Sequence, residues 1–315
     1  MRILLVKTSS LGDVIHNLPV ASDIRAALPQ ARIDWAVEEG FAAIPRLHPA
    51  IDRVIPVALR RWRKSLASRA TLREIAACRA ALRTEAYDAI IDTQGLIKSA
   101  LVACQARGRR CGFDAASTRE PLAALCQSAR FAVPRTWHAV DRNRALAAAA
   151  LGHAVPPGLD YGLGAVSPSL CFDAPCVTLL TATSRDDKLW AEAHWIALGC
   201  HLAARGLTCL LPAGSAVERA RAARIAAAIP QAQALPPSDL TTLAGVLAGS
   251  RFVVGVDTGL VHLAAALERP VVALFCASEP GLTGVLAARD AINLGARGAP
   301  PSPADVIAAT DGFAA

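Results

Sequence analysis

Residues 1–14 read MRILLVKTSSLGDV and combine a short apolar run, Ile3–Val6, with a polar turn that leads into a second apolar segment. An uninterrupted apolar run of this length is typical of a strand that is buried on both faces of a parallel sheet. Gly12 permits a tight turn, and either Ser10 or Asp13 can cap a following helix. The stretch therefore predicts a strand, a turn and a helix in that order, as in a βαβ unit.

The same order recurs along the first half of the chain, where apolar runs alternate with Ala-, Leu- and Arg-rich segments of helical spacing. The predicted strands are Ile3–Val6, Ile33–Val37, Val54–Val57 and Ala89–Asp92, and the predicted helices include Ser22–Leu28 and Thr71–Thr84. A stretch rich in Pro and Gly, residues 155–173, interrupts this order, and the order then restarts. The second half predicts strands Cys176–Leu180, Thr208–Leu211, Phe252–Val256 and Val271–Phe275, and helices Trp190–Ala204, Val217–Ile229, Leu240–Ala248 and Leu260–Leu267.

This alternation predicts an α/β fold with two Rossmann-like domains, residues 1–160 and 174–315, joined by a linker over residues 161–173. Their parallel sheets should face a central cleft, because open α/β sheets bind ligands at the carboxyl ends of their strands. No G-x-G-x-x-G motif follows a predicted strand, and no G-x-x-x-x-G-K-[ST] motif occurs. Dehydrogenases and P-loop NTPases therefore lose their main support.

The composition is that of a globular protein, with 53% hydrophobic and 19% charged residues. No apolar stretch reaches the ~18–20 residues of a membrane span, and no signal-peptide pattern is present, so we expect a cytoplasmic protein. The nine cysteines are scattered without a C-x-x-C pair. Neither a disulfide framework nor a metal site is therefore expected.

The net charge of +7 is distributed unevenly. Residues 1–150 hold 23 Lys and Arg against 13 Asp and Glu, whereas residues 151–315 hold 10 against 13. The basic excess thus lies in the first half, which should meet an anionic partner. Aromatic residues, at 4%, are too few for base stacking on a nucleic acid. An acidic small molecule or an anionic membrane surface fits better.

Four segments carry chemistry-bearing side chains. They are residues 7–13 (KTSSLGD), 181–190 (TATSRDDKLW), 254–264 (VGVDTGLVHLA) and 60–64 (RRWRK). In the first, a capping and a catalytic role for Asp13 are equally open. In the second, hydroxyls and Lys188 at a strand-to-helix turn suit phosphate oxygens. The pair Asp186 and Asp187 suggests a divalent metal, but we favour partnership with the flanking cations Arg185 and Lys188.

In the third segment, a buried strand leads into Asp257-Thr258-Gly259 and an apolar helix, so backbone N–H groups at the helix N-terminus can bind an anion. His262 should face the same site one helical turn later. The fourth segment places four cations within five residues. Because the first half of the chain also carries the basic excess, we interpret this segment as a docking site for an anion and not as a solvated loop.

Taken in order, KTSSLGDVIHNLP, RRWRK, QGLIKSA, REPLA, TSRDDKLW and VDTGLVHLAAAL resemble the bacterial lipopolysaccharide heptosyltransferases of glycosyltransferase family 9. The resemblance runs from residue 1 to about residue 285. It implies a GT-B fold, with the acceptor on the N-terminal domain and ADP-heptose on the C-terminal domain. It also implies inverting transfer of L-glycero-D-manno-heptose to the first Kdo of Kdo2-lipid A, with no cofactor and no metal.

The resemblance also implies roles for individual residues. Asp13 and Lys188 match the catalytic positions. The implied donor-binding residues are Ser10, Gly12, Thr183, Ser184, Lys188, Glu218, Asp257, Thr258, Gly259, Leu260 and His262. The implied acceptor-binding residues are Arg60, Arg61, Arg63, Lys64, Lys98, Arg119 and His138. Departures from the family pattern are a shorter stretch around Gly214–Glu218 and a segment, Phe275–Pro280, that lacks the family's Gly.

The resemblance further implies peripheral contact with the anionic inner-membrane surface and no nucleic acid partner. Three alternatives remain open. The chain could be a related heptosyltransferase that acts on heptosyl-Kdo2-lipid A, a GT-B nucleotide-sugar epimerase, or a non-catalytic scaffold that binds a nucleotide sugar.

Overall fold

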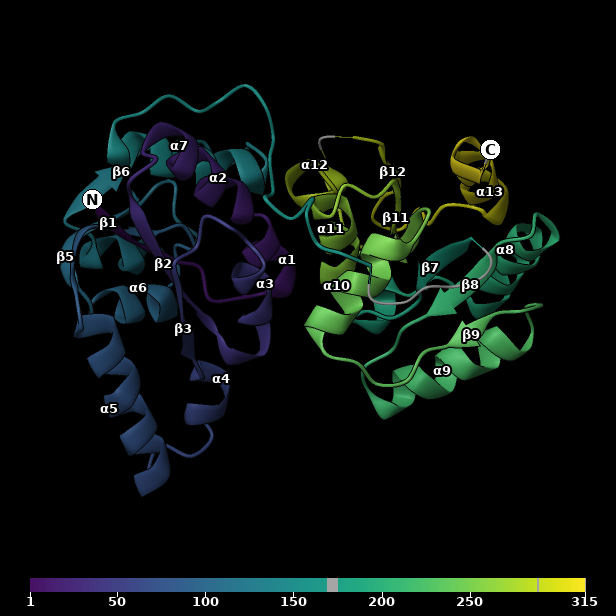
Figure 1. The fold of residues 1–315 in the computed structure, drawn as a ribbon, viewed down its shortest axis with the longest axis horizontal. Coiled ribbons are helices and arrows are strands. Elements are labelled where there is room, and N and C mark those ends of the chain that lie inside the picture. The colour runs from purple at the N-terminus through teal and green to yellow at the C-terminus, as the bar shows by residue number, and fades with distance from the viewer. Residues whose placement is uncertain (169–174, 288, 315) are drawn as a thin grey trace. The chain divides into compact units, whose positions relative to one another are not determined.

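The structure, a computed structural model, describes residues 1–168, 175–287 and 289–314. The chain divides into two compact units, Met1–Gly162 and Leu163–Ala315 (Figure 1). Residues 169–173 of the predicted linker lie outside the described residues. Each unit is described below by itself.

Unit 1 contains a six-stranded parallel sheet in the order β3-β2-β1-β4-β5-β6. Its strands are β1 (Arg2–Val6), β2 (Arg32–Glu38), β3 (Arg53–Val57), β4 (Ala86–Asp92), β5 (Arg107–Phe113) and β6 (Ala129–Phe131). The predicted parallel arrangement of the first four is confirmed. The sequence did not predict β5 or β6.

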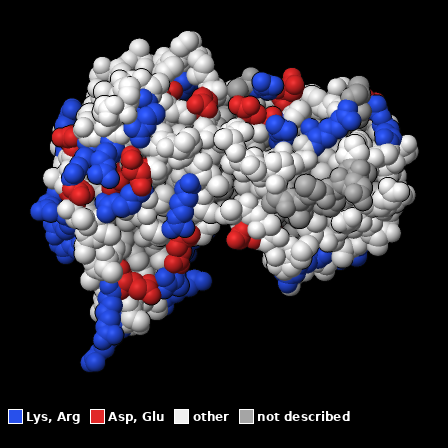
Figure 2. Space-filling view, in the orientation of Figure 1, with Lys and Arg blue, Asp and Glu red and all other residues white. Residues whose placement is uncertain are grey.

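Helices connect these strands, as the βαβ pattern requires. They are α1 (Leu11–Ile15), α2 (Leu18–Ala27), α3 (Ala43–Arg46), α4 (Leu59–Trp62), α5 (Arg69–Arg83), α6 (Ile97–Ala103) and α7 (Ala139–Leu151), with 3₁₀ turns η1 (Glu39–Phe41) and η2 (Pro121–Cys126). Side chains of β1, such as Leu4 and Val6, are fully buried and form a core cluster with Ile90 of β4. Lys and Arg side chains are dense over this unit (Figure 2).

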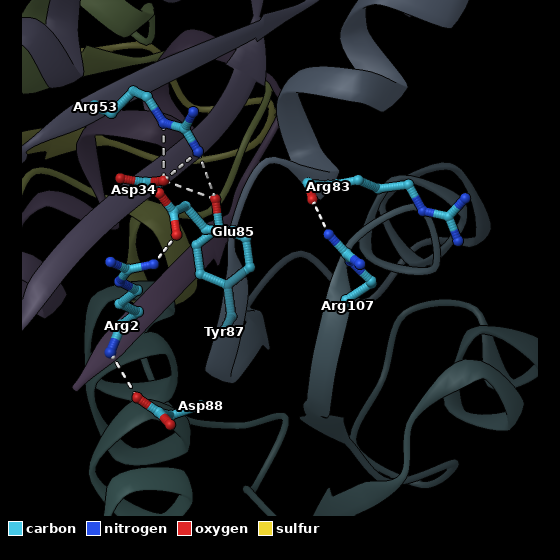
Figure 3. Close-up of polar contacts among 8 residues, drawn as sticks. All are labelled: Arg2, Asp34, Arg53, Arg83, Glu85, Tyr87, Asp88 and Arg107. Atoms are coloured by element: carbon cyan, nitrogen blue, oxygen red, sulfur yellow. Dashed lines mark hydrogen bonds and ion pairs between the residues drawn. The ribbon is translucent and has the colours of Figure 1, made fainter.

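A polar network ties the amino ends of the strands of unit 1 together (Figure 3). Asp34 Oδ2 accepts hydrogen bonds from Arg53 Nη2 (2.7 Å) and from the Tyr87 hydroxyl (2.6 Å). Burial and the adjacent Asp34 carboxylate raise the pKa of Tyr87 to about 12. The network lies at the edge opposite the carboxyl ends, so it stabilises the sheet away from the ligand-binding edge.

Unit 2 contains a second six-stranded parallel sheet, in the order β12-β11-β10-β7-β8-β9. Its strands are β7 (Cys176–Leu180), β8 (Thr208–Leu211), β9 (Gln233–Ala234), β10 (Val253–Val256), β11 (Val271–Phe275) and β12 (Ala291–Gly295). The four strands predicted for this half are confirmed. Both units therefore share one topology, in which the chain reverses direction across the sheet between the first and fourth strands.

The helices of unit 2 are α8 (Glu192–Ala204), α9 (Ala216–Ala227), α10 (Leu240–Gly249), α11 (Gly259–Ala266), α12 (Pro280–Thr283) and α13 (Pro303–Ala314), with the 3₁₀ turn η3 (Asp186–Lys188). The core of the unit includes Trp190 and Trp195, whose rings meet edge to face at 5.0 Å. The C-terminal helix α13 packs within this unit, where Val306 is fully buried.

Among the described residues, no helix combines the length and apolar character that a membrane crossing requires. Of the cysteines that the structure describes, Cys111, Cys176, Cys209 and Cys276 are buried, as expected for small apolar side chains, whereas Cys200 is exposed. Cys171 lies outside the described residues.

Candidate functional site

The strand order places a ligand-binding edge in each unit. In a doubly wound sheet, ligands bind at the carboxyl ends of the two strands between which the chain reverses direction. In unit 1 these strands are β1 and β4, and in unit 2 they are β7 and β10. Residues that follow these strands are therefore the first candidates for function.

In unit 1, the segments after β1 and β4 are joined by Gln94. Its Oε1 accepts hydrogen bonds from the backbone N–H and the hydroxyl of Thr8, both at 2.7 Å, and its Nε2 donates to the Ser9 carbonyl at 2.7 Å. All three residues are buried. Gln94 thereby fixes the backbone that leads to Asp13.

Lys7 lies beneath this segment, with a fully buried ammonium group. Its Nζ donates to the Thr93 carbonyl at 2.9 Å and to Asn143 Oδ1 at 3.3 Å. Burial lowers the pKa of Lys7, and the nearby carboxylates Asp13 and Asp92 partly oppose this shift. Lys7 thus lies close enough to Asp13 for the two charges to interact.

Asp13 lies in the first turn of α1 and is partly exposed. Its Oδ2 accepts hydrogen bonds from the backbone N–H and the hydroxyl of Ser10, at 2.8 and 2.9 Å. Within the described residues, no hydrogen bond is recorded for Oδ1. One carboxylate oxygen therefore caps the helix, while the other remains able to accept a proton, so the capping and catalytic roles are compatible. Gly12 lies in the same turn.

Lys98 and Arg60 approach the same edge from α6 and α4, the helices that follow β4 and β3. Lys98, on α6, donates to the Ser9 hydroxyl at 2.6 Å, and burial lowers its pKa, followed by repulsion from Arg60. The Arg60 backbone N–H donates to Glu38 Oε1 at 3.0 Å, and its guanidinium lies over the Phe41 ring at 5.2 Å. The structure thus brings together two of the predicted acceptor-binding cations near Asp13.

Arg119, which follows β5, lies close enough to Lys7 and Arg142 for its charge to contribute to the lowered pKa of each. Arg142 lies over the Phe113 ring, 4.7 Å from its centroid. His138 caps α7, with its Nδ1 accepting from the Val140 N–H at 3.2 Å. Arg119 therefore lies near Lys7, and the His138 ring lies 5.4 Å from the ring of His16. Arg142 is a further cation that the sequence did not single out.

The other three cations of residues 60–64 are Arg61, Arg63 and Lys64, and no contact in the described part of the chain places them beside Asp13. Arg61 forms ion pairs with Glu39 (3.0 Å) and Glu74 (2.8 Å), so its charge is already partnered. Arg63 and Lys64 follow α4 on the exposed surface. Arg63 lines an apolar pocket instead of facing Asp13.

In unit 2, the central contact joins Lys188 of η3 to Asp257, which follows β10. Lys188 Nζ lies 2.6 Å from Asp257 Oδ2, and the two side chains are only 18% and 13% exposed. Ser278, which follows β11, donates to the same carboxylate oxygen at 2.5 Å. Burial raises the pKa of Asp257, but the hydrogen bonds from Lys188 and Ser278 outweigh it, so the net pKa lies below its ordinary value.

The other predicted donor-binding residues surround this pair. The Thr183 hydroxyl donates to the Asp257 carbonyl at 3.0 Å, and Ser184 is exposed beside it. Thr258 occupies the N-cap position of α11, which begins at Gly259, and among the residues that the structure describes its side chain makes no capping hydrogen bond, so the first backbone N–H groups of this helix are available to the site. Leu260 is the second residue of α11, and His262 is buried in the same helix close to Asp257.

Glu218 lies apart from the Lys188–Asp257 pair, at the N-terminus of α9. Its Oε2 accepts from the backbone N–H groups of Gly214 (3.0 Å) and Ser215 (2.7 Å) in a capping box. The shortened stretch before α9 is therefore organised by Glu218 itself.

The sequence predicted that Arg185 and Lys188 pair with Asp186 and Asp187, and one of these two predictions is confirmed. Arg185 forms an ion pair with Asp187, as expected. The partner of Lys188, however, is Asp257, because the adjacent strands β7 and β10 bring the segments that follow them together. Across the parts of the chain that the structure describes, no group of three His, Cys, Asp or Glu side chains is arranged to hold a metal ion.

Sequence reasoning missed Gln94 and Ser278 as structural partners of the site. Each follows a strand that neighbours the one carrying the candidate residue, β4 beside β1 and β11 beside β10. The signal was therefore the position directly after a strand, which becomes informative only when the strand order is known.

Comparison with known proteins identifies the family of this chain. The model of glycosyltransferase family 9 (heptosyltransferase) matches residues 75–305. Lipopolysaccharide heptosyltransferase 1 of Salmonella typhimurium is 46% identical over 90% of this chain and 91% of its own length. Lipopolysaccharide heptosyltransferase 2 of the same organism is 27% identical over 90% of this chain and 85% of its own length.

Among solved structures, the E. coli heptosyltransferase WaaC with ADP superimposes with a TM-score of 0.93 and 41% identity, covering 99% of this chain and all of that chain. The two six-stranded parallel sheets, each with flanking helices, are the predicted GT-B arrangement of two Rossmann-like units. The chain is a glycosyltransferase and belongs to glycosyltransferase family 9, the heptosyltransferases.

Proposed function

We propose that the chain transfers L-glycero-D-manno-heptose from ADP-heptose to the first Kdo sugar of Kdo2-lipid A, with inversion at the anomeric carbon. The observation that carries this proposal is the Lys188–Asp257 pair, a positioned cation at the ligand-binding edge of unit 2. It occurs in a chain that is 46% identical to a curated heptosyltransferase 1 and 41% identical to an ADP-bound neighbour.

On the donor side, Lys188 and the N-terminus of α11 bind the diphosphate of ADP-heptose. As the bond between the anomeric carbon and the phosphate oxygen breaks, negative charge grows on the departing ADP. The Lys188 ammonium and the Gly259 backbone N–H stabilise this charge, together with the hydroxyls of Thr183, Ser184 and Thr258. Because ADP is a stable anion, its departure needs no protonation. Glu218 contacts the nucleoside.

On the acceptor side, Asp13 is the general base. Its Oδ1 takes the proton of a Kdo hydroxyl while that oxygen forms the new bond to the anomeric carbon, from the face opposite ADP. Ser10 holds Oδ2 and thereby orients the carboxylate. One carboxylate is sufficient, unlike the pair that a glycoside hydrolase uses.

The anionic groups of the acceptor bind the cations at the same edge, Lys98, Arg60 and Arg119, with His138 beside them. The exposed cations Arg63 and Lys64 meet the anionic surface of the inner membrane, with the enzyme on its cytoplasmic side. Because Arg61 is paired with Glu39 and Glu74, it holds α4 in place and contributes less to the acceptor.

We propose further that the reaction needs no resident metal, because Lys188 and the α11 N-terminus provide positive charge for the diphosphate. Turnover that persists after dialysis against EDTA supports this. Loss of turnover that Mg²⁺ restores would refute it.

The experiment that tests the function is product analysis. Incubation with ADP-heptose and Kdo2-lipid A should add one heptose to the Kdo sugar, detected by mass spectrometry and located by NMR. Heptosyl-Kdo2-lipid A, offered as the only acceptor, tests the heptosyltransferase 2 alternative and should react poorly. No product with either acceptor would leave a nucleotide-sugar epimerase or a non-catalytic scaffold that binds a nucleotide sugar.

A further inference from the structure

An apolar pocket of about 350 Å³ opens in unit 1 between α4, α5 and α6. This volume lies in the range of about 300–1,000 Å³ that is typical of small-molecule sites. Its walls include Leu59 and Trp62 of α4, Ile75 and Leu82 of α5, and Val102 of α6. Of the residues assigned above to donor or acceptor, only Arg63 lines it.

Three polar side chains that line the pocket, Trp62, Cys78 and Gln105, are already partnered by the protein. Trp62 Nε1 donates to Glu74 Oε2 at 2.8 Å, the Cys78 thiol donates to the Pro56 carbonyl at 3.7 Å, and the Gln105 amide donates to the Leu101 carbonyl at 3.2 Å. A ligand inside the pocket therefore finds apolar surface and few hydrogen-bonding groups. This excludes a peptide backbone, whose N–H and C=O groups need partners, and favours a hydrocarbon.

The mouth of the pocket is both apolar and cationic. Leu66 and Leu101 line it with 58% and 56% of their surfaces exposed. Arg63 and Arg79 also line it, and within the described residues neither forms an ion pair. An exposed leucine rim beside unpaired guanidinium groups matches the boundary between the acyl chains and the anionic headgroups of a bilayer.

The surrounding segment has a strong excess of positive charge. Residues 58–84 contain eight Lys and Arg but only one acidic residue, Glu74, whose carboxylate is taken by Arg61 and Trp62. Figure 2 shows Lys and Arg side chains at the end of unit 1 where Figure 1 places α4 and α5. Such a surface attracts anionic lipids and repels a second copy of itself.

We propose that this pocket binds one acyl chain of an anionic bilayer phospholipid, with Arg63 and Arg79 against the headgroup phosphate. The chain covers apolar walls that are otherwise open to water, while the cations hold the headgroup. This inference rests on the membrane contact proposed above and not on the identity of the transferred sugar.

Trp62 is a natural reporter, because it lines the pocket and is only 8% exposed. Bromine quenches tryptophan on contact, so the full-length protein is mixed with phosphatidylglycerol vesicles that carry brominated or ordinary acyl chains. Co-sedimentation measures the bound fraction in parallel. The emission of Trp62 is the difference in tryptophan fluorescence between wild type and Trp62→Phe in buffer. Brominated acyl chains should remove this amount of emission from the wild-type protein.

Two variants separate the pocket from general adsorption. Cys78→Phe fills the pocket and should still sediment with the vesicles but lose bromine quenching, whereas Cys200→Phe, at an exposed cysteine of unit 2, should behave as wild type. If Cys78→Phe melts early, Leu101→Gln at the exposed mouth replaces it, with Leu125→Gln, 69% exposed on η2, as its control.

Three results would overturn the proposal. Quenching that persists in Trp62→Phe would come from other tryptophans, and binding to vesicles without quenching would leave the pocket empty. Absence of vesicle binding would remove the membrane contact as well. Heptosyl transfer to a detergent-dispersed acceptor is measured separately, so its failure is distinguishable from all three.

Discussion

Lys188 and Asp257 are 69 residues apart in the sequence, yet Lys188 Nζ lies 2.6 Å from Asp257 Oδ2. The contact exists because β7 and β10 are neighbours in the sheet, and both residues follow these strands at the carboxyl edge. A third group, the Ser278 hydroxyl, donates to the same oxygen. The lysine is thus held at the N-terminus of α11 before any ligand arrives.

Replacing Lys188 by Ala should weaken ADP binding roughly 10- to 100-fold, from about 1.5–3 kcal/mol for a hydrogen bond to a charged group. Calorimetric titration with ADP measures this. Arg185→Ala is the matched control, because Arg185 is exposed and paired with Asp187, and it should leave the affinity nearly unchanged. Equal effects in the two variants would remove Lys188 from the diphosphate site.

Replacing Asp13 by Asn should lower turnover by ~10²–10⁴ while ADP affinity is retained. The Asn side chain keeps an oxygen that can accept from the Ser10 N–H, so the α1 cap survives and the base alone is lost. Thermal unfolding checks that the variant is folded. Near-normal ADP release by a folded Asp13→Asn enzyme would assign catalysis to another group.

The basic residues should differ in their effects on the acceptor. Arg60→Ser and Lys98→Met should each raise the acceptor KM about tenfold, the effect of losing one charge-assisted contact worth ~1.4 kcal/mol, with the donor KM unchanged. Arg61→Met should instead lower the melting temperature, because Arg61 is paired with Glu39 and Glu74. Steady-state kinetics with both substrates varied separates these cases. A donor KM that rises in Lys98→Met would contradict the assignment.

Asp92 makes the stability of the protein depend on pH. Burial raises the pKa of this carboxyl to about 6, above the ordinary value of 3.8. Between these pH values the folded state binds more protons than the unfolded state, so this group makes stability fall as pH rises from about 4 to 6. The whole contribution is up to about 3 kcal/mol.

Asp92→Asn should remove this fall, because the amide stays neutral. Its oxygen can accept from the Gln94 N–H, as Asp92 Oδ1 does at 3.0 Å, and its NH₂ can donate to Gln127 after an amide flip. Gln127 Oε1 is buried with no recorded partner in the described parts of the chain. Denaturant unfolding at pH 4, 6 and 8 measures the difference from wild type. A difference that does not change between pH 4 and 6 would contradict the raised pKa.

Most of the strands predicted from the sequence are buried along most of their length; the exception is β3, in which only Ile55 and Val57 are buried. The runs at β1, β10 and β11 are apolar almost throughout because helices cover both faces of the sheet. The strand β5 was missed because it reads RGRRCGF, with arginines in the half that is exposed and apolar residues only from Cys111 onward. A strand is predicted from its run of apolar residues, which reflects burial. A strand that is exposed over half its length has too few apolar residues to be predicted in this way.

The sequence identified the segments that form the site, but it did not show which of their residues contact each other. Lys188 and Asp257 both lie in family motifs. Their contact depends on the order of the strands, which could not be predicted from the sequence. The same reason explains why the sequence assigned Lys188 to the neighbouring carboxylates. Arg61 shows the converse, because nothing within RRWRK distinguishes a residue paired with Glu39 and Glu74 from its exposed neighbours.

If the chain transfers heptose to a Kdo sugar, an acceptor bearing Kdo must be present for ADP to leave rapidly. The decisive measurement is the rate of ADP release from ADP-heptose, with and without Kdo2-lipid A. We predict fast release with Kdo2-lipid A and only slow hydrolysis without it. Equal rates in the two reactions would contradict heptosyl transfer to this acceptor.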